Sequence, residues 1–564
     1  MGALKQLTIN LIMPNSDTSN VLDAQHDADD LLKDIKQLVS IGISLSAEKD
    51  TERLLEHILV SAQDLTHADG GTLYLLTHND KLSFEMMRTR SLGIALGGPK
   101  YKAVELNPVP LFDDSGEPNN KNIAAFAALT GKVINIVDAY DAEGFNFQGT
   151  KDYDKKTGYR SKSFLTLPMK NHDNQIIGVL QLINAMDGEN NNEVIAFSTE
   201  SQRLAESLAS QAAVALTNQQ LISDLRILLE RFIEVIAGAI DEKSPYTGGH
   251  CRRVPKIAML LADAVNNVDK GLFADLTFSE QELYELKIAA LMHDCGKITT
   301  PIHVVDKATK LETIFDRIKL IESRFALLKR DAEINLLQEV MSSNDKEQEM
   351  LRKNYEKLLA TLDEELDFIS TANIGGEYMA EAKQQRVKDI AKRRYRDIHG
   401  EWQPLLTEEE IYNLCIAKGT LTTEERDVIN YHMQSTINML EKLPFPSHLK
   451  NVPEIAGGHH ETMDGKGYPR GLTRDEMSVQ ARIMGIADVF EALTAADRPY
   501  KKAMPISQAL TILGNMKLES HIDPDLFDVF LHHKVYEKYA QDYLSDEQSD
   551  DFDETKLPGF NPLN

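Results

Sequence analysis

With 564 residues, the chain is too long for a single hydrophobic core, and we expect two to four domains. Its formal net charge of −27 argues against DNA binding, which needs a basic surface, but is compatible with a small anionic ligand held by local cations. The sequence has no apolar run of about 18 residues, contains three cysteines and begins without the apolar core of a signal peptide, so we expect a cytoplasmic protein with no membrane span.

The first 198 residues combine helical and strand-like segments. Residues 1–30 are polar and lack periodicity, and we predict a flexible leader there. Apolar residues then recur at helical spacing from Leu31 to Leu65. Strand-like runs follow at 71–76, 82–86, 133–136, 163–169 and 176–185, with a helical run at 123–129. Over residues 31–198 the order of these segments resembles a GAF sensory domain.

The sequence leaves open whether this domain binds a ligand. Asn184 and Phe197 fit the motif of cyclic-nucleotide-binding GAF domains, whereas Ala185 and Ser201-Gln202 depart from it. A sensor for an unknown ligand and a domain used only for dimerisation are both compatible with these residues.

Residues 199–241 form a segment without proline and with helical periodicity. Polar Gln211 and Asn218 share one heptad stripe with a series of apolar residues. The apolar residues are Leu204, Leu208, Ala215, Ile222, Leu225, Leu229, Phe232 and Ile236. Because such a stripe is typical of a coiled coil, we expect a connecting helix that pairs two chains into a homodimer. The alternative is a single helix packed on its own domains.

We predict an all-helical domain over residues 242–540, interrupted by an insertion at 311–420. Two apolar series within the insertion predict a helical hairpin that turns near Ser342–Asp345. The segment 541–564 is acidic and poor in apolar residues, so we expect an unstructured tail. The predicted fold class is multidomain α+β.

Histidines and carboxylates recur in short blocks of the helical domain. One block reads His293-Asp294-Cys295-Gly296-Lys297, and another reads His459-His460-Glu461, followed by Gly467-Tyr468-Pro469. His250, His432 and Asp488 stand singly. Because buried imidazoles need hydrogen-bond partners or a metal, ligands spread this widely predict a metal site that the fold closes.

These blocks, with Tyr246–Arg253, Leu421–Glu425 and Arg498–Tyr500, resemble the HD-GYP family in content and order. Members of that family are metal-dependent phosphodiesterases that open cyclic dinucleotides. The resemblance therefore implies a hydrolase of bacterial second-messenger signalling. A general HD-type phosphohydrolase would explain His293, Asp294 and Asp488 but not the paired histidines or Gly467-Tyr468-Pro469.

The resemblance also implies two sets of metal ligands. One cation would be bound by His250, His293, Asp294 and Asp488, and the second by Asp294, His432, His459 and His460. Asp294 would bridge the two cations and act, with Lys297, as a catalytic residue. Four or more imidazoles suit iron or manganese, with nickel or zinc as alternatives. Tyr246 stands where some members carry a glutamate that holds a third metal, so we expect two divalent cations.

Further roles follow from the same resemblance. Lys297 is expected to contact the substrate phosphate. Arg498 and either Lys501 or Lys502 are candidates for binding the second phosphate or a guanine. Thr247 and Arg253 are expected to hold the metal ligands in position without binding the cations themselves. Asp464, Gly467, Tyr468 and Pro469 are expected to form a loop motif, because glycine permits unusual backbone geometry and proline stiffens the exit.

The favoured function is hydrolysis of cyclic di-GMP to linear pGpG, with GMP as the product of a further cleavage, under regulation by the N-terminal domain. Within the enzyme class, the mixed 3′,3′-cyclic GMP-AMP dinucleotide is the alternative substrate. A receptor that binds a cyclic dinucleotide without turnover is the alternative outside that class. Retention of every inferred ligand and of Lys297 favours the enzyme.

Overall fold

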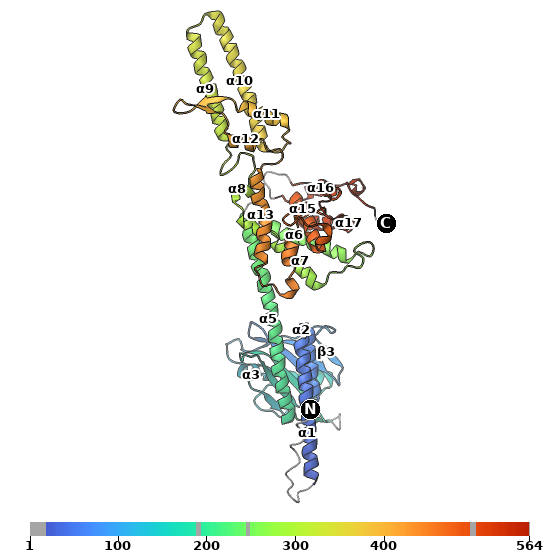
Figure 1. Cartoon of the computed structure of the whole chain (residues 1–564). Coiled ribbons are helices and arrows are strands. Elements are labelled where there is room, and N and C mark those ends of the chain that lie inside the picture. The colour runs from blue at the N-terminus through green and yellow to red at the C-terminus, as the bar shows by residue number, and fades with distance from the viewer. Residues whose placement is uncertain (1–17, 188–192, 244–248, 497–502, 563–564) are drawn as a thin grey trace, which may run out of the picture. The chain divides into compact units, whose positions relative to one another are not determined.

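The computed structural model describes residues 18–187, 193–243, 249–496 and 503–562 (Figure 1). The chain divides into two compact units, Met1–Ile227 and Leu228–Asn564, and the long helix α5 (Thr199–Lys243) contributes residues to both. The first unit contains an antiparallel sheet and the second is mainly helical, which confirms the predicted α+β class. Within the described residues, no helix is both long and apolar enough to cross a lipid bilayer.

The first unit is built around one sheet in the order β3-β2-β1-β7-β6-β5, with β4 paired to β2 and β8 to β7. The strands are β1 (Ala68–Leu76), β2 (Lys81–Thr89), β3 (Ile94–Leu96), β4 (Val109–Pro110), β5 (Ile134–Ile136), β6 (Phe164–Lys170), β7 (Ile176–Met186) and β8 (Val194–Ile195). The helices of this unit, besides α5, are α1 (Thr18–Ala47), α2 (Thr51–Thr66), α3 (Ile123–Thr130) and α4 (Gln148–Thr157).

Both faces of this sheet are covered, which explains the apolar character of the central strands. Leu73 of β1 packs in a cluster with residues of α2 and α5, whereas the next residue, Tyr74, packs with residues of α3. Successive strand residues point to opposite faces, so β1 and β7 must be apolar on both. The helices and strands predicted over residues 31–198 are present in the structure, with the predicted type and in the predicted order.

The structure corrects two expectations for the first unit and α5. Residues 18–30 belong to helix α1, so the prediction of a flexible leader is wrong for that stretch, and residues 1–17 lie outside the described part. Helix α5 is confirmed, but its predicted stripe does not share one environment. Leu208 and Ala215 are buried in the first unit, and Leu229 and Ile236 pack against the core of the second.

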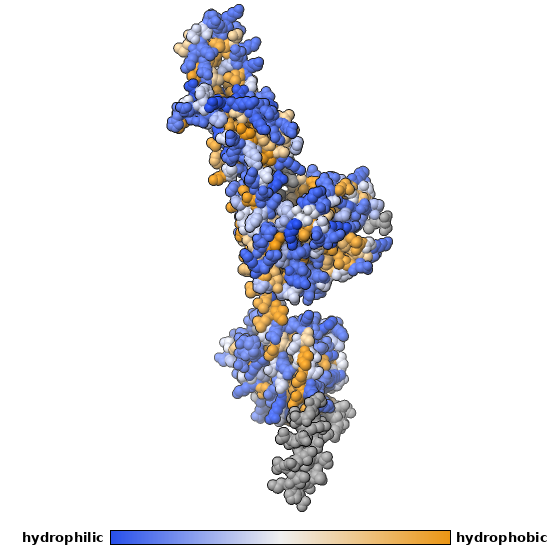
Figure 2. Space-filling view, in the orientation of Figure 1, coloured by the Kyte–Doolittle hydropathy of each residue, from blue (hydrophilic) through white to orange (hydrophobic). Residues whose placement is uncertain are grey.

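Leu225 and Phe232 of the predicted stripe belong to another series of apolar residues on α5, which is exposed and spaced alternately by four and three residues. These residues are Leu221, Leu225, Leu228, Phe232 and Val235, each 49–68% exposed. They give α5 the hydrophobic surface visible in Figure 2.

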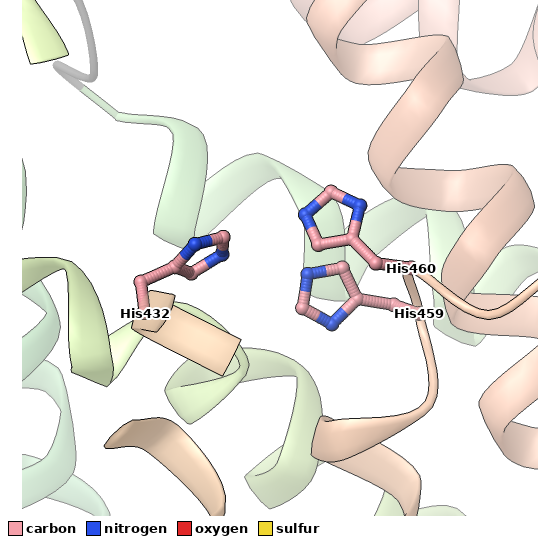
Figure 3. A group of neighbouring side chains, drawn as sticks. All are labelled: His432, His459 and His460. Atoms are coloured by element: carbon pink, nitrogen blue, oxygen red, sulfur yellow. The ribbon is translucent and has the colours of Figure 1, made fainter. Parts of the chain in front are cut away.

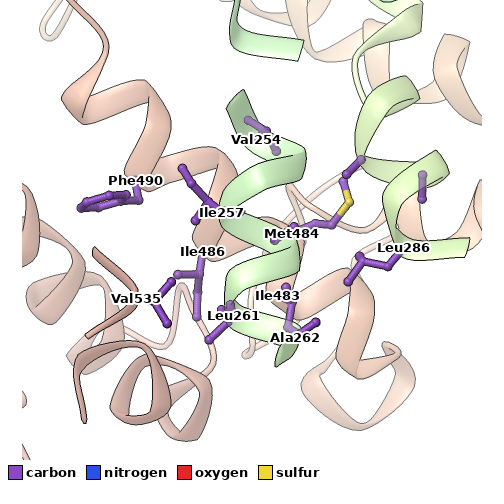
Figure 4. Close-up of a cluster of buried hydrophobic side chains, with 14 of the residues drawn as sticks. Val254, Ile257, Leu261, Ala262, Leu286, Ile483, Met484, Ile486, Phe490 and Val535 are labelled. Atoms are coloured by element: carbon purple, nitrogen blue, oxygen red, sulfur yellow. The ribbon is translucent and has the colours of Figure 1, made fainter. Parts of the chain in front are cut away.

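The second unit packs its helices around α6 (His250–Asn266). Figure 4 shows Val254, Ile257 and Leu261 of α6 surrounded by Ile483 and Phe490 of α15 and by side chains of neighbouring helices. Outside the insertion, the other helices of this unit are α7 (Glu280–Met292), α8 (Ile302–Val305), α13 (Thr423–Leu440), α14 (Val452–Gly457), α15 (Val479–Thr494), α16 (Ile506–Leu518), α17 (Pro524–His532) and α18 (Val535–Tyr543). Short 3₁₀ helices are η1 (Cys295–Thr299), η2 (Ser447–Leu449), η3 (Arg474–Glu476), η4 (Asp546–Gln548) and η5 (Glu554–Lys556).

The insertion has a hydrophobic core of its own. Helices α9 (Ile318–Met341) and α10 (Asp345–Ile374) form the predicted hairpin, in which the Asn344 side chain caps α10. The remaining elements are α11 (Glu381–Ile390), β9 (Arg394–Arg396), β10 (Trp402–Pro404) and α12 (Glu408–Leu414). Phe325, Leu362, Val387 and Leu405 are buried together there.

The prediction of an unstructured acidic tail is wrong. The Gln548 side chain is buried and donates hydrogen bonds to the carbonyl oxygens of Thr494 and Met504. Leu557 is buried in the main core of the unit, and the carboxylate of Asp550 accepts a hydrogen bond from Ser507 N. A few anchors therefore hold a segment whose average composition is that of a solvated chain.

Candidate metal centre

Six helical elements of the second unit bring the predicted ligands together. His250 begins α6, and His293 and Asp294 lie between α7 and η1. His432 is on α13, His459 and His460 follow α14, and Asp488 is in the middle of α15. The fold therefore joins residues that are far apart in sequence.

The first group consists of His250, His293, Asp294 and Asp488. His250 Nε2 lies 3.2 Å from His293 Nε2, 3.2 Å from Asp488 Oδ1 and 3.3 Å from Asp294 Oδ2. Donor atoms that share one cation at about 2.1 Å lie roughly 3.0–3.4 Å from each other in octahedral or tetrahedral geometry. The four side chains thus have the spacing of a single coordination sphere.

The second group consists of His432, His459 and His460, whose imidazoles face a common space in Figure 3. His432 Nε2 lies 3.4 Å from Asp294 Oδ1, whereas Asp294 Oδ2 faces the first group. The two oxygens of one carboxylate therefore point to two neighbouring groups of ligands. This is the geometry that a bridging carboxylate requires.

Backbone carbonyls orient three of the imidazoles. Nδ1 of His293 bonds to Ala290 O at 2.8 Å, Nδ1 of His432 to Ile429 O at 2.5 Å and Nδ1 of His459 to Ala456 O at 2.8 Å. A carbonyl only accepts, so each Nδ1 carries the proton and each Nε2 presents a lone pair to the site.

Three of these buried atoms have no hydrogen-bond partner among the described residues. They are Asp294 Oδ1, His432 Nε2 and His459 Nε2, all of them acceptors. A buried polar atom without a partner costs free energy, and a divalent cation would satisfy all three atoms. The donor set therefore fits bound metal.

The pKa shifts of His459, His460 and Asp294 agree with a cation site, whereas at His250 and His293 burial is outweighed by Asp294 and Asp488, which raise both pKa values. Burial and the neighbouring charge of His460 hold the pKa of the His459 imidazole well below its usual value, and burial lowers the pKa of His460 to about 4. Burial works against ionisation of Asp294, but Lys297, His293 and His250 outweigh it and hold its pKa well below the ordinary range. Neutral imidazoles and an ionised carboxylate are the forms that bind metal.

Glu491 contacts a predicted ligand and was not identified from the sequence. It is 1% exposed, and its carboxylate accepts hydrogen bonds from Nδ1 of His250 and from Nε of Arg253 at 2.6 Å. Arg253, predicted to support the ligands, contacts His250 only through Glu491 in this network, and its role stays a prediction. The sequence could have indicated Glu491, because it follows the predicted ligand Asp488 by three residues and therefore lies on the same face of α15.

Gly296 allows α13 to approach the ligands closely. A Cβ atom at this position would lie 2.0 Å from the carbonyl oxygen of His432 and 2.6 Å from Thr436 N, and Gly296 N donates to Thr436 Oγ1 at 2.9 Å. Two residues earlier, Asp294 directs one carboxylate oxygen to each group. One residue later, Lys297 places its ammonium 2.5 Å from Asp294 Oδ2.

The Gly-Tyr-Pro loop packs directly against His460, a predicted ligand. The ring of Tyr468 stacks on His460 with 4.8 Å between centroids, and the Tyr468–Pro469 peptide bond is cis. A Cβ on Gly467 would lie 2.4 Å from Glu461 Cα. Glu461, buried beside His460, accepts hydrogen bonds from the backbone N–H of Arg470 and Leu472. Asp464 bonds with Thr462 and Lys466 at the outer edge of the loop.

Thr247, Arg498, Lys501 and Lys502 lie outside the described residues, as does Tyr246. Their predicted roles stay predictions. Among the residues predicted to bind substrate, Lys297 alone falls in the described part of the chain.

Comparison with known families agrees with the division of the chain. The family model for the GAF domain matches residues 50–216, and two family models for the HD domain match residues 247–366 and 408–526. The two HD matches include all seven predicted ligands, and the gap between them falls inside the insertion.

Three curated relatives match parts of the chain. A stretch of 109 residues, 19% of this chain and 23% of the relative, is 44% identical to 3′3′-cGAMP-specific phosphodiesterase 3 of Vibrio cholerae. A second stretch, 20% of this chain and 26% of the relative, is 35% identical to a cyclic di-GMP phosphodiesterase of Pseudomonas aeruginosa. A third, 24% of this chain and 36% of the relative, is 31% identical to the cyclic di-GMP phosphodiesterase of Thermotoga maritima. The chain thus spans less than two fifths of each of these relatives.

Proposed function

Because the chain is a member of the HD-GYP family that carries a GAF domain ahead of its HD region, we propose that it hydrolyses a phosphodiester bond in cyclic di-GMP to give linear pGpG. The observation that carries this proposal is the pair of ligand groups that share Asp294, with Asp294 Oδ2 and Oδ1 directed to different groups. Two such groups suit a pair of divalent cations, for which we propose iron or manganese.

The residues of the chain fit this chemistry. His250, His293, Asp294 and Asp488 would hold one cation, and Asp294, His432, His459 and His460 the other. Bound together, the cations supply charge that stabilises an in-line displacement at phosphorus and activate water as the nucleophile. Lys297, beside Asp294 and 27% exposed, has its ammonium at the edge of the site, where it would neutralise charge on a phosphate oxygen.

The Gly-Tyr-Pro loop and Glu491 would keep the ligands in place during turnover. Tyr468 covers one face of the His460 ring, and Glu491 fixes Nδ1 of His250. Both contacts restrict an imidazole that would otherwise rotate about its side-chain bonds. A positioned ligand set keeps the reacting phosphate within reach of the nucleophile.

A second substrate has a specific observation in its favour. The relative that is 44% identical over the matched stretch is named for 3′3′-cGAMP, so the mixed cyclic GMP-AMP dinucleotide is the competing candidate. The ligand groups act on the phosphodiester that both dinucleotides contain. The preference for cyclic di-GMP or for the mixed dinucleotide therefore depends on contacts to the bases and not on the predicted metal ligands.

The test is a product assay on the purified chain loaded with iron or manganese, with cyclic di-GMP and 3′,3′-cyclic GMP-AMP supplied separately. We expect linear dinucleotide from cyclic di-GMP and a loss of turnover of about 10³-fold or more in His432→Ala. His448→Ala, which removes an exposed histidine of η2, serves as the matched control. Turnover of the mixed dinucleotide alone would reassign the substrate, and tight binding of either without product would identify a receptor.

We also propose that the chain acts in the cytoplasm as a homodimer paired through α5 and regulated by its GAF domain. The support for pairing is the exposed series Leu221, Leu225, Leu228, Phe232 and Val235, whose alternating spacing is that of a coiled-coil seam. Leu225→Glu should shift the molar mass measured by light scattering from dimer to monomer. Ser223→Glu, an exposed residue off this series, should leave the mass unchanged.

A further inference from the structure

The last turn of α5 contacts two elements that carry ligands of the first group. The carboxylate of Asp241 accepts hydrogen bonds from the backbone N–H of Gly249 at 3.1 Å and of Cys251 at 3.4 Å, on either side of His250. The ammonium of Lys243 donates to Lys297 O at 3.0 Å, to Thr300 O at 2.7 Å and to Ile298 O. Two residues in the last turn of one helix thus contact the backbone beside His250 and the backbone of the segment that follows Asp294.

The contact made by Asp241 is a helix cap. The first N–H groups of a helix have no partner within it, and a carboxylate is favoured at that positive end. Gly249, the residue before α6, has a φ of +87° and no side chain to act as a cap, so Asp241 supplies one from α5. The first residue of the capped helix is His250.

The contact made by Lys243 is the complementary one. The last carbonyls of a helix lack partners within it and favour a cation. Lys243 binds carbonyls at the end of η1, whose first turn follows Asp294 and contains Lys297. The bonds of Asp241 and Lys243 are charge-assisted. Asp241 is 6% exposed, so water competes little for its carboxylate.

From this pair of contacts we infer that Asp241 and Lys243 are positioning residues that couple α5 to the metal centre. His250 Nε2 and Asp294 Oδ2 lie 3.3 Å apart, so a displacement of about 1 Å between α6 and η1 would spoil their shared coordination sphere. Asp241 fixes the backbone around the first of these residues, and Lys243 fixes the turn that follows the second. A movement of α5 therefore changes the distance between the two ligands. The part of this inference that concerns turnover rests on the proposed function, whereas the part that concerns metal affinity does not.

The first experiment measures metal affinity in the full chain. We expect Lys243→Met and Asp241→Asn each to weaken manganese binding about tenfold. This is the lower end of the loss seen when a residue that orients a metal ligand is removed. Lys243→Arg should keep most of the parental affinity. Hydrogen exchange should rise in peptides that cover 249–252 and 294–300. Glu242→Gln, an exposed neighbour on the same turn, should match the parent in both measurements.

The second experiment tests whether the position of α5 affects metal affinity and turnover at the metal centre. One alanine inserted after Gln220 rotates the following part of the helix by about 100°, whereas seven inserted residues restore the phase to within about 20°. We expect the single insertion to change manganese affinity or kcat at least threefold in the parent. In the Asp241→Asn/Lys243→Met double variant, which lacks both contacts between α5 and the metal centre, the single insertion should change neither manganese affinity nor kcat. The seven-residue insertion should have little effect on either quantity in the parent or in the double variant.

Every outcome decides the inference. Unchanged affinity and hydrogen exchange in folded Lys243→Met and Asp241→Asn, or an equal effect of the insertion in parent and double variant, would overturn it. A parent that binds manganese but hydrolyses neither cyclic dinucleotide would refute the proposed function alone. In that case weaker metal binding in Lys243→Met would still support the coupling.

Discussion

Lys297 Nζ lies 2.5 Å from Asp294 Oδ2, so a buried carboxylate that faces both ligand groups also has an ammonium as its neighbour. The two residues should fail in different ways when replaced. Asp294→Ala removes a donor from each group, and we expect it to lower bound metal and to abolish turnover. Lys297→Ala should keep the metal but slow kcat by about 10²-fold, because it removes only charge stabilisation of the phosphate. Metal analysis and kcat on the same preparations separate the two effects, and parental activity of Asp294→Ala would refute the assignment.

Glu491 should tune the affinity of the first group through His250. Glu491→Gln keeps the shape of the side chain and an oxygen that accepts from Nδ1, but it removes the negative charge that makes the imidazole a better donor to metal. We expect manganese affinity to fall about 10- to 100-fold, with the melting temperature of the chelated protein less affected. Glu441→Gln, an exposed residue after α13, is the control. Equal affinities of Glu491→Gln and the parent would show that Glu491 only links α15 to α6 through Arg253.

Gly296 should tolerate no larger residue. The alanine Cβ would meet the His432 carbonyl oxygen at 2.0 Å, and neither η1 nor α13 can withdraw without separating Asp294 from His432. We expect Gly296→Ala to lower the free energy of unfolding by about 3 kcal/mol and to reduce metal binding. Gly376→Ala, at a position with no atom within 4 Å of the added Cβ, should change neither quantity. Denaturant unfolding and metal titration of both variants give the comparison.

Asp523 should make the second unit sensitive to acid. Burial disfavours its charged form, but a hydrogen bond from Arg474 Nε at 2.9 Å, the N–H of Leu526 and the charge of Arg482 outweigh burial and lower the pKa of this carboxyl. A carboxyl with a lowered folded pKa stabilises the protein above its unfolded pKa of about 4, and this stability is lost as the pH falls through the folded value.

Asp523→Asn should therefore destabilise the protein by about 3 kcal/mol at pH 7, because Arg474 and Arg482 lose a buried partner. Its unfolding free energy should then depend less on pH between about 5 and 3 than that of the parent. Asp475→Asn, an exposed residue of η3, should follow the parental curve. A parallel pH dependence of Asp523→Asn and the parent would contradict the prediction.

Much of the candidate site was predictable because its chemistry is concentrated in short blocks of sequence. His293-Asp294 and His459-His460 are adjacent pairs, and a histidine pair in an apolar frame has few structural explanations. The structure brings all seven predicted ligands into two groups that share Asp294. Their role as ligands stays a prediction that metal analysis will test.

The supporting residues could not be found in the same way. Asp241 and Lys243 make hydrogen bonds to backbone groups, which carry no residue pattern. The spacing of Glu491 to Asp488 places both on one face of α15, but it does not identify His250 as the partner of Glu491. The stripe on α5 failed for a related reason. Periodicity identifies an apolar face but not its partner, and Leu208 and Leu229 turned out to pack into the cores of their own units. The tail shows that composition averages over a segment, whereas a few anchors such as Gln548 decide whether it packs.

The two ends of the insertion meet at Lys307. Its ammonium contacts Asn413 and Glu425, both at 2.9 Å, and its carbonyl oxygen accepts from the Thr420 hydroxyl at 3.0 Å. The insertion thus leaves the helices that carry the predicted ligands and returns to them at neighbouring positions around Lys307. A segment attached in this manner can lengthen, shrink or acquire new binding partners over evolutionary time while the histidines behind it keep their places.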